Sequence, residues 1–92
     1  MEPFAFDAVI QKVPDQDAAY VIVPLDIRKA FGKGRLAVQA TFDGVAYAGS
    51  VVNMGVKDAQ GNICYIIGLR KEIRARIGKQ AGDRVHVTIT AR

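Results

Sequence analysis

The sequence predicts a mainly-β domain, in which about six strands form a barrel that two short α-helices cap. A chain of 92 residues makes one small domain with a single hydrophobic core. Several segments alternate apolar and polar residues, as half-buried strands do. One unit, strand-strand-helix-strand, occurs twice, and neither copy could bury its apolar faces alone. We therefore expect the two copies to close on each other about a pseudo-twofold axis.

The repeat joins residues 23–33 to residues 69–79 at a constant offset of 46 positions. Both segments place apolar residues at i, i+4 and i+8, share an acid and an arginine, and end on Gly-Lys. The matched pairs are Val23/Leu69, Asp26/Glu72, Ile27/Ile73, Arg28/Arg74 and Phe31/Ile77. The apolar spacing is that of one helix face, so we expect these apolar pairs to occupy equivalent buried places. The pseudo-repeats cover about 1–46 and 47–92 of a single domain, 1–92.

Six segments have the pattern of strands, either by alternation or as short apolar runs. They are residues 4–11, 18–23, 35–42, 45–53, 62–68 and 83–90. Asp43-Gly44 predicts a tight hairpin, because a type I′ turn needs positive φ at both central residues. Gly49, in the middle of a strand, predicts a bulge or a close backbone approach.

Two helices are predicted between these strands. The first starts at Pro24, since a proline at the first helical position loses no hydrogen bond, and Asp26 complements the positive end of the helix dipole. Gly32 and Gly34 end it. The second helix covers residues 69–77, with Glu72 at the place of Asp26.

The composition is that of an ordinary protein of the cytoplasm. The single Cys64 cannot form an internal disulfide, the first residues lack the pattern of a signal peptide, and no apolar run approaches the ~18 residues that span a bilayer. The net charge is +4. Residues 1–46 carry five basic and six acidic side chains, against eight and three in residues 47–92. Such asymmetry is found in polyanion-binding proteins, but also serves solubility.

Several short motifs resemble those of known families. Residues 22–28, Ile-Val-Pro-Leu-Asp-Ile-Arg, are similar to the strand-to-helix junction of the AbrB/MazE-type swapped-hairpin proteins, and residues 70–87 are similar to the rest of that motif. That family usually makes its barrel from two chains, whereas both halves lie in one chain here. The whole pattern resembles the domain-of-unknown-function family nineteen-oh-five, in motifs spread over nearly the full chain: Phe4-x-Phe6, Val23-Pro24, Asp43-Gly44, Gly49-Ser50, Gly78 and Gly82-Asp83.

The second resemblance implies a double-split β-barrel formed by the internal repeat. It implies no agreed activity, and it implies that such domains can stand beside other small bacterial domains.

Catalytic machinery is not evident in the sequence, so we expect no enzyme, no cofactor and no metal site. His86 lies between two valines of a strand, which directs it outward, and it has no cysteine or carboxylate at ligand spacing. Cys64 lies in an apolar strand and is interpreted as a small core residue. A nucleophilic cysteine needs a base nearby, and nothing in the sequence places His86 close to it.

Basic side chains form the candidate ligand-binding or polyanion-binding site. They decorate the second helix, its exit and the start of the last strand: Arg70, Arg74, Arg76, Lys79 and Arg84. Clustered cations of this kind contact phosphates in nucleic-acid-binding proteins. The alternative is a solvated helix face, whose long side chains cover apolar surface.

Three functional hypotheses remain open. The first is a non-catalytic binding or interaction module, in which the barrel mouth or the loop 54–61 meets a protein or a small ligand. The second is a nucleic-acid-binding, AbrB-like regulator that uses the basic second half without sequence specificity. The third, an enzyme, has the least support. We expect a monomer with no membrane contact.

Overall fold

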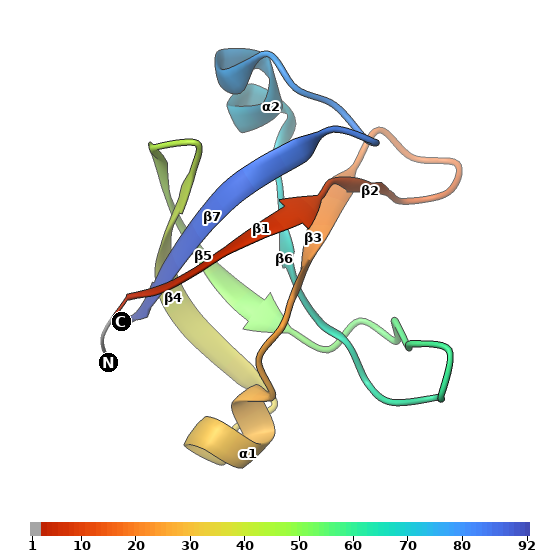
Figure 1. Cartoon of the computed structure of the whole chain (residues 1–92), viewed down its shortest axis with the longest axis vertical. Coiled ribbons are helices and arrows are strands. Elements are labelled where there is room, and N and C mark those ends of the chain that lie inside the picture. The colour runs from red at the N-terminus through yellow and green to blue at the C-terminus, as the bar shows by residue number, and fades with distance from the viewer. Residues whose placement is uncertain (1–2) are drawn as a thin grey trace.

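One antiparallel sheet curves into a nearly closed barrel, so that the alternating apolar residues of its strands face the inside. A short helix lies at each end of its longest dimension (Figure 1). The computed structural model describes residues 3–92. Its elements are β1 (Phe4–Val9), β2 (Gln11–Lys12), β3 (Ala19–Val23), α1 (Ile27–Phe31), β4 (Arg35–Phe42), β5 (Val45–Val52), β6 (Tyr65–Gly68), α2 (Lys71–Ile77) and β7 (Arg84–Ala91). The strands lie in the order β1-β7-β4-β5-β6-β3-β2. This architecture confirms the predicted mainly-β barrel with two short helices.

Residues 3–92 form seven strands where about six were predicted, because the first predicted strand breaks at Ile10. The Ile10 side chain is 1% exposed. Its N–H donates to the Asp83 carbonyl at 2.8 Å, and its carbonyl accepts from the Gly82 N–H at 2.9 Å. Beyond Ile10 the chain leaves β7 and pairs with β3. The break therefore lets one segment join the two ends of the sheet.

The pairing registers show the symmetry of the repeat. When a twofold axis relates two copies of a repeat, it passes between strands at the point where a residue pairs with the matched residue of the other copy. Val21 pairs with Ile67, its counterpart at the offset of 46 positions, in the β3–β6 ladder. Ala40 pairs with Ile89 in the β4–β7 ladder, where the offset has grown to 49. The pseudo-twofold axis therefore passes through these two ladders.

Both helices bury one apolar side against the barrel. Ile27 is fully buried and Ile73 is 7% exposed, while Phe31 and Ile77 are half-buried against the same core. The matched apolar positions of the repeat therefore do occupy equivalent places. None of the helices in residues 3–92 is both long enough and apolar enough to span a membrane.

The helix starts differ from the prediction. Pro24 lies outside α1, and Asp26 is its N-cap, where the carboxylate accepts a hydrogen bond from the Lys29 N–H at 3.1 Å. Helix α2 begins earlier within its own copy, with Arg70 at the N-cap and no side-chain cap bond. The prediction that Pro24 occupies the first helical position is therefore wrong. Asp26 stabilises the helix start by a capping hydrogen bond.

The tight hairpin is confirmed, and the irregularity expected at Gly49 is not. Asp43 and Gly44 both have positive φ, 47° and 86°, as a type I′ turn requires. The β4–β5 register continues through Gly49 without a bulge. A Cβ on Gly49 would lie closer than 3.0 Å to the ring of Tyr47. The close approach at Gly49 is therefore made by a neighbouring side chain and not by backbone.

Candidate functional site

Two surface hollows lie where a strand runs into a helix. The larger, about 360 Å³, lies where β6 meets α2, and we name it the α2 hollow. It is lined by residues 17–19 and 68–72, together with Tyr47 and Arg74. The smaller, about 190 Å³, lies where β3 meets α1, and we name it the α1 hollow. It is lined by residues 22–26 and 63–65.

These hollows are the two copies of one feature of the repeat. Residues 22–26 and 68–72 are related by the offset of 46 positions, and so are residues 17–19 and 63–65. Their chemistry differs at almost every position. In the α2 hollow smaller or charged residues replace apolar ones: Gly68 for Ile22, Ala18 for Cys64, Ala19 for Tyr65, Arg70 for Pro24, Lys71 for Leu25 and Asp17 for Ile63. One copy is therefore open and charged, and the other is filled and apolar.

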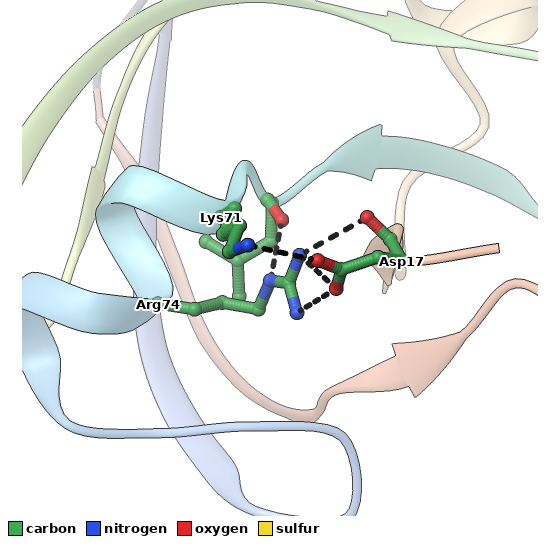
Figure 2. A network of polar contacts seen from close by, with 4 residues as sticks. Asp17, Lys71 and Arg74 are labelled. Carbon is green, nitrogen blue, oxygen red and sulfur yellow. Dashed lines mark hydrogen bonds and ion pairs between the residues drawn. The ribbon is translucent and has the colours of Figure 1, made fainter.

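Asp17 binds two of the cations of the α2 hollow (Figure 2). Both terminal nitrogens of Arg74 lie 3.3 Å from Asp17 Oδ1, and Lys71 Nζ lies 3.4 Å from Oδ2. Arg74 Nε also donates to the Leu69 carbonyl at 3.2 Å. The bond from Lys71, followed by that from Arg74, holds the pKa of Asp17 below its usual value. Arg74, only 14% exposed, therefore clamps the turn before β3 to the start of α2.

Arg70 is held by an aromatic ring instead of a carboxylate. Its guanidinium carbon lies 5.5 Å from the centroid of the Tyr47 ring, within the range of a cation–π contact. Its Nε donates to the Tyr47 hydroxyl at 3.3 Å. Tyr47 packs in turn on Phe42, with ring centroids 6.2 Å apart. Within residues 3–92 Arg70 has no ion pair with an acid, and the residue is exposed.

The other three candidate cations lie outside both hollows. Lys79 Nζ lies 2.6 Å from Asp43 Oδ2 and donates to the Arg84 carbonyl at 2.6 Å. The bond from Lys79, followed by one from the His86 N–H, lowers the pKa of Asp43. Arg76 and Arg84 are exposed. The structure thus brings Arg70 and Arg74 together, while it ties Lys79 to the β4–β5 hairpin.

His86 and Cys64 differ in part from their interpretation. His86 points outward, as expected, but it does have a carboxylate partner, because Asp7 lies opposite it in the β1–β7 ladder with Nδ1 and Oδ1 2.7 Å apart. The pairing register that creates this contact is not visible in the sequence. Cys64 is half-buried and precedes β6, so its placement in a core strand is wrong. It lines the α1 hollow.

A third feature is an apolar surface, of which only the part that lies in the loop 54–61 was expected as a site from the sequence. A hollow of about 280 Å³ adjoins the outer side of β3 and β6, and Ile22 and Ile63 line the nearby α1 hollow. The apolar surface comprises Val13, Pro14, Tyr20, Ile22, Met54, Val56, Ile63 and Ile66. The sequence did carry a signal for this surface, because residues 18–23 are apolar on both faces of their strand.

The chain matches the model of a known family over residues 6–89: the domain of unknown function DUF1905. The chain belongs to this family. No curated protein matches it. The DUF1905 assignment confirms the second resemblance seen in the sequence, and the similarity to AbrB/MazE-type proteins stays a prediction. Because the family description states no activity, the function has to be argued from the hollows and the apolar surface.

Proposed function

We propose that this chain is a non-catalytic interaction module, which binds an apolar segment of a partner polypeptide on the apolar surface. One observation carries the proposal. Among residues 3–92, four large hydrophobic side chains are exposed, and three of them, Ile22, Met54 and Ile63, belong to this surface. Exposed apolar groups that gather in one place mark interaction sites more often than isolated ones do.

The apolar surface arises because two neighbouring strands are apolar on their outer sides. Ile22 pairs directly with Ile66 in the β3–β6 ladder, so both side chains lie on the same face. In β3 the outward residues Tyr20 and Ile22 alternate with buried ones. Antiparallel strands with one solvated side usually carry polar residues there. The departure from that pattern is what a docking surface requires.

The loop that carries Met54 is braced by its own hydrogen bonds. Asp58 accepts from the N–H groups of Gln60 and Asn62, both at 2.9 Å, and Lys57 forms a bridge with Ile63. Met54 is 70% exposed. A surface that is ordered before binding loses less conformational freedom when the partner arrives.

The volumes and charges indicate the class of partner. Hollows of about 280 and 190 Å³ are smaller than the ~300–1,000 Å³ of small-molecule pockets, so they suit single side chains of a polypeptide. Carboxylates stand at the borders: Asp15 follows Pro14, Asp26 lines the α1 hollow, and Asp58 lies in the Met54 loop. We therefore expect aliphatic or aromatic side chains flanked by lysine or arginine. The apolar surface offers area for contact and not a paired acid and base, which supports a non-catalytic role.

Selection from a random peptide library against the full chain tests the proposal. The expected peptides combine apolar residues with lysine or arginine. Their affinity should fall about tenfold or more in the double variant Met54→Ser, Ile63→Ser, because each loses ~1–2 kcal/mol of apolar contact. Val9→Ser is the matched control, since Val9 is 41% exposed and lies on β1, outside the apolar surface.

Three results would overturn this proposal. The first is a library that yields no enriched peptide, and the second is a set of peptides that bind the double variant as tightly as they bind the Val9→Ser control. The third is sedimentation of the unmodified chain as a dimer that Met54→Ser dissociates, because the apolar surface would then bind a second copy.

Nucleic-acid binding by the basic second half is the weaker candidate. Arg74 and Lys79 are already paired with Asp17 and Asp43, so fewer cations remain to replace counterions on a phosphate backbone. Titration of labelled duplexes of varied sequence at about 50 and 200 mM salt tests it, since each phosphate neutralised adds about −0.9 to the log–log slope. We expect weak binding, and a duplex preferred about a thousandfold would revive this candidate.

A further inference from the structure

We infer that the α2 hollow is a binding site for a small ligand that carries a carboxylate or phosphate group. The inference rests on the difference between the two copies of one hollow inside the same chain. It does not depend on the apolar surface, which lies on the other copy and its surroundings.

The α2 hollow is open because small residues from both halves of the chain line it. Gly68, Ala18 and Ala19 stand where the other copy has Ile22, Cys64 and Tyr65, and the volume is about 360 Å³ against about 190 Å³. A Cβ on Gly68 would meet nothing within 4 Å, so packing does not demand glycine there. The larger volume lies within the range of small-molecule sites, ~300–1,000 Å³.

The charges of the α2 hollow leave one cation available to a ligand. Its lining holds Arg70, Lys71 and Arg74 against Asp17 and Glu72, an excess of one positive charge. Asp17 is already engaged by Arg74 and Lys71. Of the three cations that line the hollow, Arg70 is the one without an ion pair to an acid of residues 3–92.

Arg70 is also held in position before any ligand binds. The Tyr47 ring and hydroxyl hold the guanidinium through Nε, and Tyr47 can lie where it does because Gly49 has no Cβ. The one side-chain hydrogen bond that Arg70 makes within residues 3–92 uses Nε, which leaves the two terminal amino groups to donate to a ligand. A planar guanidinium with two parallel donors matches a carboxylate or a phosphate, so we place the anionic group of the ligand at Arg70.

Amide chemical shifts in ¹⁵N–¹H spectra of the full chain test the inference, with benzoate and inorganic phosphate as the two probes. Benzoate offers a carboxylate with a flat apolar ring, and phosphate offers charge alone. We expect saturable shifts confined to residues 17–19, 47 and 68–74 for at least one probe. The probe that binds more tightly identifies which of the two anion classes the hollow takes.

Three variants sharpen the test. Arg70→Gln should weaken binding about tenfold or more, the loss expected for a charge-assisted hydrogen bond. Gly68→Ile should do the same by filling the hollow as Ile22 fills its copy, and the spectrum should otherwise stay that of the folded chain. Arg76→Gln removes an equal charge from α2 outside the hollow, and the affinity should stay within about twofold.

The inference fails if neither probe gives saturable shifts, or if the shifts spread over all basic segments. It fails equally if Arg76→Gln costs as much affinity as Arg70→Gln, because binding would then reflect the general charge of the helix. Retained binding in Gly68→Ile would also overturn it, since the hollow itself would not be used.

Discussion

The two ends of the barrel share one backbone plan and differ in chemistry. At the α1 end, Asp26 caps the helix, and the adjoining hollow is lined mainly by apolar side chains. At the α2 end the N-cap is Arg70, without a side-chain cap bond, and the hollow is lined by charged and small residues. The pairing of Val21 with Ile67 shows that these ends are related by symmetry. The repeat therefore constrains the buried residues and leaves the surfaces of the two copies free to differ.

The largest expected effects test whether the two copies are equivalent in the core. Ile27→Ala and Ile73→Ala should each lower the free energy of unfolding by about 2–5 kcal/mol, because each leaves a cavity against the barrel. Because Ile27 is fully buried and Ile73 is 7% exposed, the loss of unfolding free energy in Ile27→Ala should be at least as large as that in Ile73→Ala. Denaturant unfolding measures both, with Ile63→Ala at 49% exposed as a control expected to cost less than about 1 kcal/mol. A small loss at only one helix would show that the copies are not energetically equivalent.

Two glycines beside the α2 hollow should respond in opposite ways. Gly49→Ala places a Cβ against the Tyr47 ring and should destabilise the fold by about 1–3 kcal/mol, as overpacking does. Gly68→Ala meets no atom within 4 Å and should be neutral or slightly stabilising. Thermal unfolding compares them. In a Tyr47→Ala background the cost of Gly49→Ala should largely disappear, and an unchanged cost would mean that the ring is not its cause.

The features that the sequence predicted are those whose cause is local. Alternation located the strands, Asp43-Gly44 marked the hairpin, and the apolar spacing of i, i+4 and i+8 around Ile27 and around Ile73 predicted the buried side of each helix. The break at Ile10 was not predictable, because it depends on which strand each half of the segment joins. The Asp17–Arg74 and Asp7–His86 contacts were missed for the same reason. They link residues 57 and 79 positions apart, and only the strand order brings these residues together.

Helix capping offers a smaller and more local test of the same comparison. Asp26→Ala should cost about 1 kcal/mol, because the Lys29 N–H loses its acceptor. Glu72→Ala, at the matched position of the repeat, removes an acid from the first turn of α2 where no cap bond exists. Its expected cost is only about 0.3–1 kcal/mol, from the helix dipole. Denaturant unfolding of both variants measures the difference, and equal losses would show that the two helix starts are stabilised in the same way.

The smallest expected effect concerns pH and two acids that are partly exposed. Folding lowers the pKa of Asp17, chiefly through Lys71 and Arg74, and of Asp43, chiefly through Lys79. A carboxylate whose pKa is lower in the folded state stabilises the fold when the pH is above its ordinary pKa of 3.8. This stability is lost as the pH falls through the pKa of the folded state. Asp43→Asn keeps a residue that tolerates positive φ but loses the ion pair with Lys79. The unfolding free energy of Asp43→Asn should therefore be lower than that of the unmodified chain near neutral pH, and the two should converge as the pH falls below 3.8 and through the folded pKa of Asp43. Asp17→Asn should behave in the same way at the α2 end. If either variant kept a constant difference from the unmodified chain while the pH fell from neutral through the acid range below 3.8, its ion pair would not be the source of the acid sensitivity.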